Sequence, residues 1–112
     1  MIKPSDPRDL VVDLIPRSTC CVQVSAVIAD NRGIFAWGWN SPGGGYGEHA
    51  EMAAIRRSNK NRLHGATIYV GSVRQRTGKS IKSKPCPDCQ YIIDKYELQV
   101  VWRNANEEWI YE

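Results

Sequence analysis

Four residues in two short stretches of the sequence have the types needed for metal-assisted hydrolysis. His49 can offer a neutral imidazole nitrogen, and Cys86 and Cys89 can offer thiolates. Three such ligands leave the fourth position of a tetrahedral zinc ion free for water. Glu51, two residues after His49, could carry the proton of that water. The sequence therefore predicts a hydrolytic site with one zinc ion.

The spacing of these residues places them at the starts of two helices. Cys86 and Cys89 are three positions apart, so a helix would present both sulfurs on one face. Glu51 would not share a face with His49 in a regular helix, so both residues must lie at its irregular start. Two helix N-termini directed at one point would make an electropositive pocket that suits thiolates and a hydroxide ion.

Periodic patterns predict the elements that would position these residues. Helices are expected over about 6–15, with Ser5 or Asp6 as the cap, over 48–58, and from 86 to 95 or 96. Strands are expected over 20–29, 34–40, 67–73, 98–103 and 109–111, and the first two form a hairpin. The strand and helix order of the second half implies parallel crossovers. We therefore expect one α/β domain over residues 1–112, with a catalytic core from about 20 to 103.

Length and composition fit an ordinary globular protein. The chain has 112 residues, of which 42% are hydrophobic and 24% charged, enough for one core and too few for two domains. The N-terminal residues lack the apolar segment of a signal peptide, and no run of about 18 apolar residues occurs. We therefore expect a cytoplasmic protein with no membrane contact.

Positive charge is concentrated in the middle of the chain. No acidic residue lies between Glu51 and Asp88, whereas nine of the 15 Lys and Arg residues do. Five of these cations fall in the loop expected over 74–84: Arg74, Arg76, Lys79, Lys82 and Lys84. They are candidate contacts for the phosphate of a nucleotide or for a nucleic-acid backbone. The other interpretation is a solvated basic face that keeps the protein soluble.

Several other residues have a chemical and a structural interpretation. Cys20 and Cys21 would point to opposite faces of a strand, so we interpret them as small buried residues. His64 is interpreted as a surface or capping residue. A closed structural zinc site would need one of these three as a fourth ligand, and it would leave Glu51 without a role.

Two further features could border a substrate. The glycine-rich segment 41–47 is interpreted as an entry wall rather than a phosphate loop, because it lacks the Lys-Ser/Thr ending of that motif. Trp37, Trp39 and Tyr46 could stack on a base, although tryptophans that alternate in a strand commonly serve packing.

His49-Ala50-Glu51 together with Pro85-Cys86-Pro87-Asp88-Cys89 resembles the signature of the cytidine deaminase superfamily, over a span from about Cys20 to Trp102. The resemblance implies a three-layer α/β/α sandwich around a mixed sheet of four to five strands. It also implies attack of zinc-bound hydroxide on C4 of cytosine, or C6 of adenine, with Glu51 as proton shuttle. Asn40 and the backbone N–H of Ala50 would contact the substrate, and a homo-oligomer is expected.

Within the superfamily, two substrate classes remain open. Ile92-Ile93 and Val100-Val101 after the cysteine pair are similar to deoxycytidylate deaminases, whereas Gly38 to Pro42 is similar to tRNA adenosine deaminases. The chain lacks the Asn-x-Glu ribose motif of nucleoside deaminases. We expect a zinc-dependent cytidine or deoxycytidylate deaminase acting on a free pyrimidine nucleotide. The alternatives are a deaminase that edits RNA or single-stranded DNA, and a zinc-containing binding module without turnover.

Overall fold

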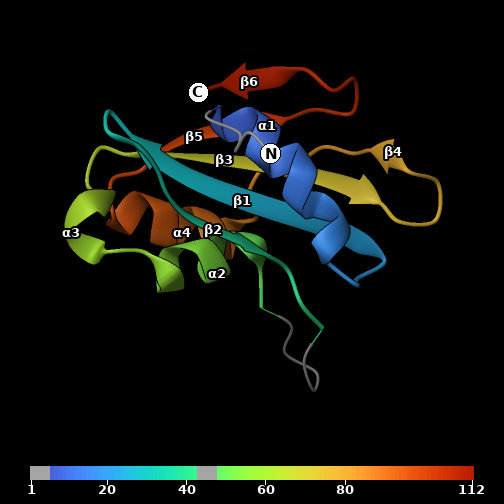
Figure 1. Ribbon diagram of the computed structural model, residues 1–112, viewed down its shortest axis with the longest axis horizontal. Coiled ribbons are helices and arrows are strands. Elements are labelled where there is room, and N and C mark those ends of the chain that lie inside the picture. The colour runs from blue at the N-terminus through green and yellow to red at the C-terminus, as the bar shows by residue number, and fades with distance from the viewer. Residues whose placement is uncertain (1–5, 43–47) are drawn as a thin grey trace, which may run out of the picture.

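A computed structural model describes residues 6–42 and 48–112, and its centre is a six-stranded mixed sheet (Figure 1). The strands are β1 (Val22–Asp30), β2 (Gly33–Trp39), β3 (Thr67–Arg74), β4 (Lys79–Ser80), β5 (Gln99–Arg103) and β6 (Trp109–Tyr111). They follow the order β2-β1-β3-β5-β6, with β4 paired to β3. β3 and β5 run parallel and the other pairs run antiparallel.

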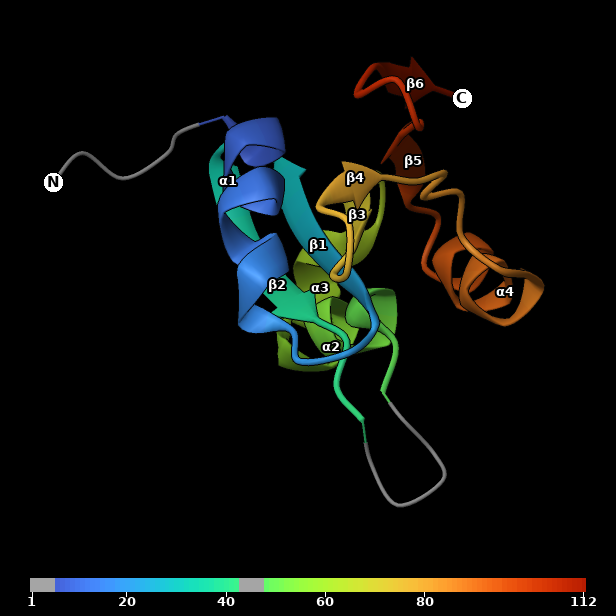
Figure 2. The same cartoon turned by 90° about the vertical axis from the view of Figure 1, so that its right-hand side faces the viewer.

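Helices cover both faces of this sheet, so the expected three-layer α/β/α architecture is confirmed. Helix α1 (Pro7–Leu14), followed by the 3-10 turn η1 (Ile15–Arg17), packs on one face. Helices α2 (Ala50–Arg57) and α4 (Pro87–Lys95) pack on the other face, and the short α3 (Lys60–Leu63) follows α2. Figure 2 shows α1 and α4 on opposite sides of the sheet. No helix among the described residues has the length and apolar character to cross a membrane.

Local sequence explains where several of these elements begin. Asp6 caps α1 by accepting a hydrogen bond from the backbone N–H of Arg8 at 2.9 Å, and Pro7 occupies the first helical position. The alternative cap, Ser5, lies outside the described residues. Gly33 has a φ of +114°, which only glycine adopts readily, and it ends the turn between β1 and β2.

Two glycines allow helices to approach the sheet closely. A Cβ atom on Gly38 of β2 would lie 2.7 Å from both Ala53 Cβ and the backbone nitrogen of Ala54 in α2. A Cβ atom on Gly71 of β3 would lie 2.6 Å from Val11 Cγ1 in α1. Both distances are far shorter than the roughly 3.5–4.0 Å of ordinary carbon contacts. The absence of a side chain at these positions therefore sets the spacing between the layers.

The structure differs from the sequence-based expectations at three places. Strand β4 lies inside the segment expected to be a loop, and it makes the sheet one strand larger than the expected maximum. Helix α3 was not expected. The interpretation of Cys20 and Cys21 as buried strand residues is wrong: β1 begins at Val22, Cys20 is half-buried and Cys21 is exposed.

Candidate metal centre and active site

The three expected metal ligands converge at the starts of α2 and α4. His49 is the N-cap residue of α2 and has an extended backbone, and its carbonyl accepts the hydrogen bond from Ala53 N at 2.9 Å. Cys86 is the N-cap residue of α4, and Cys89 lies within its first turn. His49 Nδ1 lies 3.6 Å from Cys86 Sγ and 3.2 Å from Cys89 Sγ.

These separations fit a tetrahedral zinc ion. Zinc–nitrogen distances of about 2.0–2.1 Å and zinc–sulfur distances of about 2.3 Å place the N and S atoms of a tetrahedral site about 3.6 Å apart. The ligand atoms of His49, Cys86 and Cys89 all lie within 4.8 Å of one another. Within residues 6–42 and 48–112 this is the one such group of metal-binding side chains, and Cys20, Cys21 and His64 do not belong to it. A closed four-ligand site is therefore not formed by the described residues.

Glu51 lies beside this group and is almost completely shielded from solvent. It occupies the first turn of α2, and 6% of its surface is exposed. Burial raises its pKa, although its own backbone N–H, the charge of His49 and the Cys89 thiol act in the opposite direction. A carboxyl group with a raised pKa can both accept and return a proton near neutral pH.

The environment of the Cys89 thiol favours its protonated form until a cation is bound. Burial raises its pKa above the ordinary value, and the negative charge of Glu51 acts in the same direction. The helix N-terminus alone therefore does not convert this thiol to a thiolate. A bound metal would supply the missing positive charge and release the proton.

A cavity of about 350 Å³ opens onto the metal-binding group. Its walls come from the start of α2, the end of β2 and the beginning of β1, and they include Cys20, Val24, Asn40, Ser41, Pro42, Glu48, His49, Ala50 and Glu51. The volume lies within the range of about 300–1,000 Å³ that is usual for small-molecule sites. A larger cavity of about 660 Å³ lies at the opposite end of β1, around the β1–β2 turn and α3, and contains none of the expected catalytic residues.

Comparison with known families agrees with this arrangement. The sequence profile described as the cytidine and deoxycytidylate deaminase zinc-binding region matches residues 9–103. The chain belongs to this deaminase family. The resemblance found in the His49 and Cys86–Cys89 motifs is thereby confirmed.

Solved structures of two deaminases and of a third protein share the fold of this family member. Cytidine deaminase from Burkholderia pseudomallei superposes with a TM-score of 0.75 at 18% identity, covering 95% of this chain and 88% of that chain. The dCMP deaminase from the cyanophage S-TIM5 superposes with a TM-score of 0.66 at 23% identity, covering 88% and 79%. RibD from Acinetobacter baumannii gives 0.66 at 22% identity, covering 88% of this chain and 27% of that chain. No curated protein sequence matches the chain.

Asn40, an expected substrate contact in this deaminase family member, is fixed by three hydrogen bonds. Its Oδ1 accepts from Ser18 Oγ at 2.6 Å and from Val24 N at 2.9 Å, and its Nδ2 donates to Val22 O at 2.8 Å. One amide N–H has no partner among these contacts, and Asn40 lines the cavity. The residue therefore organises the chain before β1 and can still offer one donor to a ligand.

Ala50, the second expected substrate contact, is the first residue of α2 and lines the same cavity. Backbone N–H groups in the first turn of a helix have no partner within the helix. Its placement is therefore consistent with the expected backbone contact to a substrate ring.

The five cations of segment 74–84 do not line this cavity. Lys82 Nζ lies over the Trp102 ring at 5.7 Å, and Lys84 Nζ lies 3.6 Å from Glu112 on the β6 side of the sheet. Arg74, Arg76 and Lys79 are exposed on the β3–β4 hairpin. This hairpin is joined to the cavity wall, because Gln75 N donates to the carbonyl of Cys21, next to Cys20, at 2.9 Å.

The two described tryptophans that could stack on a base lie on the other face of the sheet. Trp39 packs against the α1 cluster, between the guanidinium groups of Arg17 at 5.6 Å and Arg57 at 5.0 Å. Trp37 pairs with Val27, a member of the same cluster, and therefore points to the α1 face. The structure thus favours packing for both, whereas Tyr46 and most of the glycine-rich segment lie outside the described residues.

The structure confirms the expectation for His64 and reveals a role of Glu48 that was not expected. His64 is exposed at the end of α3, 3.2 Å from Glu97, so the surface interpretation is confirmed. Glu48 lines the cavity and forms a bidentate ion pair with Arg56, which the sequence analysis did not anticipate. Its position next to His49 is the signal that could have identified it.

Proposed function

We propose that the protein is a zinc-dependent hydrolytic deaminase that converts cytosine to uracil in a free pyrimidine nucleotide. The observation that carries this proposal is the meeting of His49, Cys86 and Cys89 within 4.8 Å at a cavity that also contains buried Glu51. His49, Cys86 and Cys89 would hold the ion. A bound zinc ion would lower the pKa of a coordinated water toward about 7.

Glu51 would transfer the protons of the reaction, first as a general base and then as a general acid. Water adds to C4 of cytosine and ammonia leaves, so both protons of the water must move, one to the ring nitrogen and one to the departing amine. A buried carboxyl with a raised pKa is suited to both steps. The free N–H of Asn40 and the backbone N–H of Ala50 would orient the sugar and the base.

The cavity suits a single base with its sugar, whether the nucleotide is free or is flipped out of a strand. Its volume of about 350 Å³ is near the lower end of the small-molecule range. Among the cations of segment 74–84, Arg74 is a candidate for contacting a 5′-phosphate. It lies opposite Val22, two positions from the cavity residue Val24, so the strand period directs both side chains to the same face of the sheet.

Editing of single-stranded nucleic acid is the second candidate function. Arg74, Arg76 and Lys79 are exposed beside the cavity instead of lining it, which would also suit contacts that follow several phosphates of a strand.

We further propose a cytoplasmic homo-oligomer. The four cysteines are free, as a reducing compartment would keep them.

Ammonia release from deoxycytidylate, measured beside a cytosine-containing single-stranded oligonucleotide, tests the proposal. We expect turnover of the mononucleotide alone. Glu51→Ala should keep its zinc and lose about 10²–10⁴-fold in rate, because the ligands remain while the proton carrier is gone. Turnover of the oligonucleotide alone would favour the editing function. Zinc binding without turnover of any cytosine or adenine substrate would favour a binding module.

A further inference from the structure

We propose that Arg56 and Glu48 form a positioning pair that holds the metal ligand His49 in place. The inference rests on the zinc site proposed above and concerns residues that do not themselves bind the metal.

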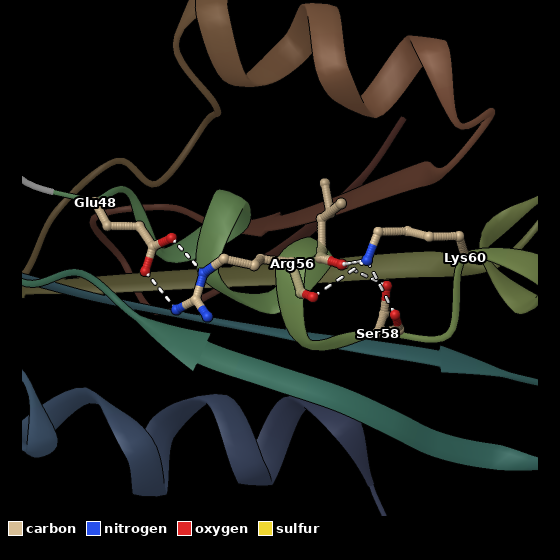
Figure 3. Close-up of polar contacts among 5 residues, drawn as sticks. Glu48, Arg56, Ser58 and Lys60 are labelled. Carbon is tan, nitrogen blue, oxygen red and sulfur yellow. Dashed lines mark hydrogen bonds and ion pairs between the residues drawn. The ribbon is translucent and has the colours of Figure 1, made fainter.

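The contacts of Glu48 restrain the chain from two directions. Arg56 Nε and Nη2 donate to the two carboxylate oxygens of Glu48 at 2.8 and 2.9 Å (Figure 3). The backbone of Glu48 exchanges two hydrogen bonds of 3.1 Å with Ser41, just beyond β2. Glu48 is thus tied by its main chain to the end of β2 and by its side chain to the last turn of α2.

His49 has little packing of its own to restrain it. Its backbone is extended and lies outside the regular part of α2, and the residue is exposed. The two cysteines belong to α4, whereas His49 depends on the path by which the chain enters α2. The ion pair reaches from the residue before His49 to the far end of the helix. It therefore fixes the direction of that entry.

The pair is too exposed to serve mainly for stability. The side chains of Arg56 and Glu48 are 60% and 33% exposed, and exposed ion pairs contribute little to folding free energy. Loss of the pair should therefore appear in metal affinity rather than in resistance to unfolding.

A matched control exists in the same molecule. Arg62 binds Asp30 with the same two-pronged geometry, through Nε at 2.9 Å and Nη2 at 2.7 Å. That pair joins α3 to the β1–β2 turn and lines the larger cavity at the opposite end of β1 from the metal-binding group. Arg57, next to Arg56, provides a second control for the loss of one positive charge.

The test compares zinc affinity in Arg56→Gln, Arg62→Gln and Arg57→Gln, measured by competition with a chromophoric chelator. We expect Arg56→Gln to bind zinc about tenfold more weakly, the lower end of the roughly 10–100-fold effect of outer partners of metal ligands. The two control variants should stay within about twofold of the wild type. Arg56→Lys should recover part of the loss, and the visible spectrum of the cobalt-substituted protein should change in Arg56→Gln alone.

Equal zinc affinity in Arg56→Gln and wild type would overturn the inference, as would an equal loss in Arg62→Gln. If Arg56→Gln does not fold, Glu48→Gln is compared with Asp30→Asn by the same criteria. A wild-type protein that binds no zinc would instead refute the proposed function. Normal zinc binding in the wild type with no specific effect at Arg56 would refute the positioning role alone.

Discussion

Replacing Gly38 by alanine should damage the metal site from a distance. The added Cβ would lie 2.7 Å from Ala53 Cβ and from Ala54 N, about 1 Å closer than ordinary contacts permit. Because one of these atoms is backbone, the strain can be relieved only by moving α2 away from β2. We expect a loss of about 1–3 kcal/mol in unfolding free energy, as for other overpacked sites. A shift of about 1 Å at His49 and Glu51 can lower the rate about 100-fold.

Gly71→Ala is the control for this prediction. Its new Cβ would lie 2.6 Å from Val11 Cγ1, so a similar loss of stability is expected, but the displaced helix is α1. Urea unfolding, zinc affinity and turnover of folded protein should be measured for both variants. Normal zinc affinity and turnover in Gly38→Ala would refute the idea that the contact between β2 and α2 sets the geometry of the site.

Two other predictions concern charges away from the cavity. Lys60 Nζ donates to the carbonyls of Ile55, Ser58 and Arg56 at 2.7, 3.0 and 3.2 Å. Lys60→Met should therefore lower the unfolding free energy by about 1 kcal/mol in urea unfolding. The control variant Lys95→Met should leave it unchanged. The hydrogen-bonded Arg62 side chain lowers the pKa of Asp30 to about 2, below its ordinary value of about 3.9. The wild type should therefore exceed Asp30→Asn in unfolding free energy by the full amount above about pH 4, and this difference should disappear toward about pH 2. A difference in unfolding free energy that stays constant across that range would contradict the lowered pKa of Asp30.

The strongest sequence signals predicted the framework of the site correctly. Apolar residues at helical spacing located α1 and α2, runs of β-branched, apolar and aromatic residues located β1, β2, β3 and β5, and the cysteine spacing located α4, with ends that differ by one or two residues, as helix and strand ends commonly do. The expected ligands were recognisable because the chemistry demands particular residue types at short spacing within each of two motifs, His49-x-Glu51 and Cys86-x-x-Cys89. His49, Cys86 and Cys89 follow that requirement.

The features that the sequence did not predict depend on contacts between distant segments. The two residues of β4 and the four of α3 are too few to show a period. Cys20 and Cys21 precede β1, in a part of the chain that Asn40, just after β2, holds through hydrogen bonds to Ser18 Oγ and to the carbonyl of Val22. Lys84 meets Glu112 only once β6 is in place. No local pattern contains this information.

The separation of the candidate ligands along the chain would give a bound zinc ion a role in folding as well as in chemistry. Cys86 and Cys89 are 37 and 40 positions from His49, so a metal held by all three would close a loop of about that length. A permanent cross-link of this span reduces the entropy of the unfolded chain by the equivalent of about 4 kcal/mol. Zinc would then act as a reversible cross-link between α2 and α4. Scarcity of the metal in a cell would reduce the amount of folded protein as well as its rate, which would make the deaminase subject to proteolysis whenever zinc is limiting.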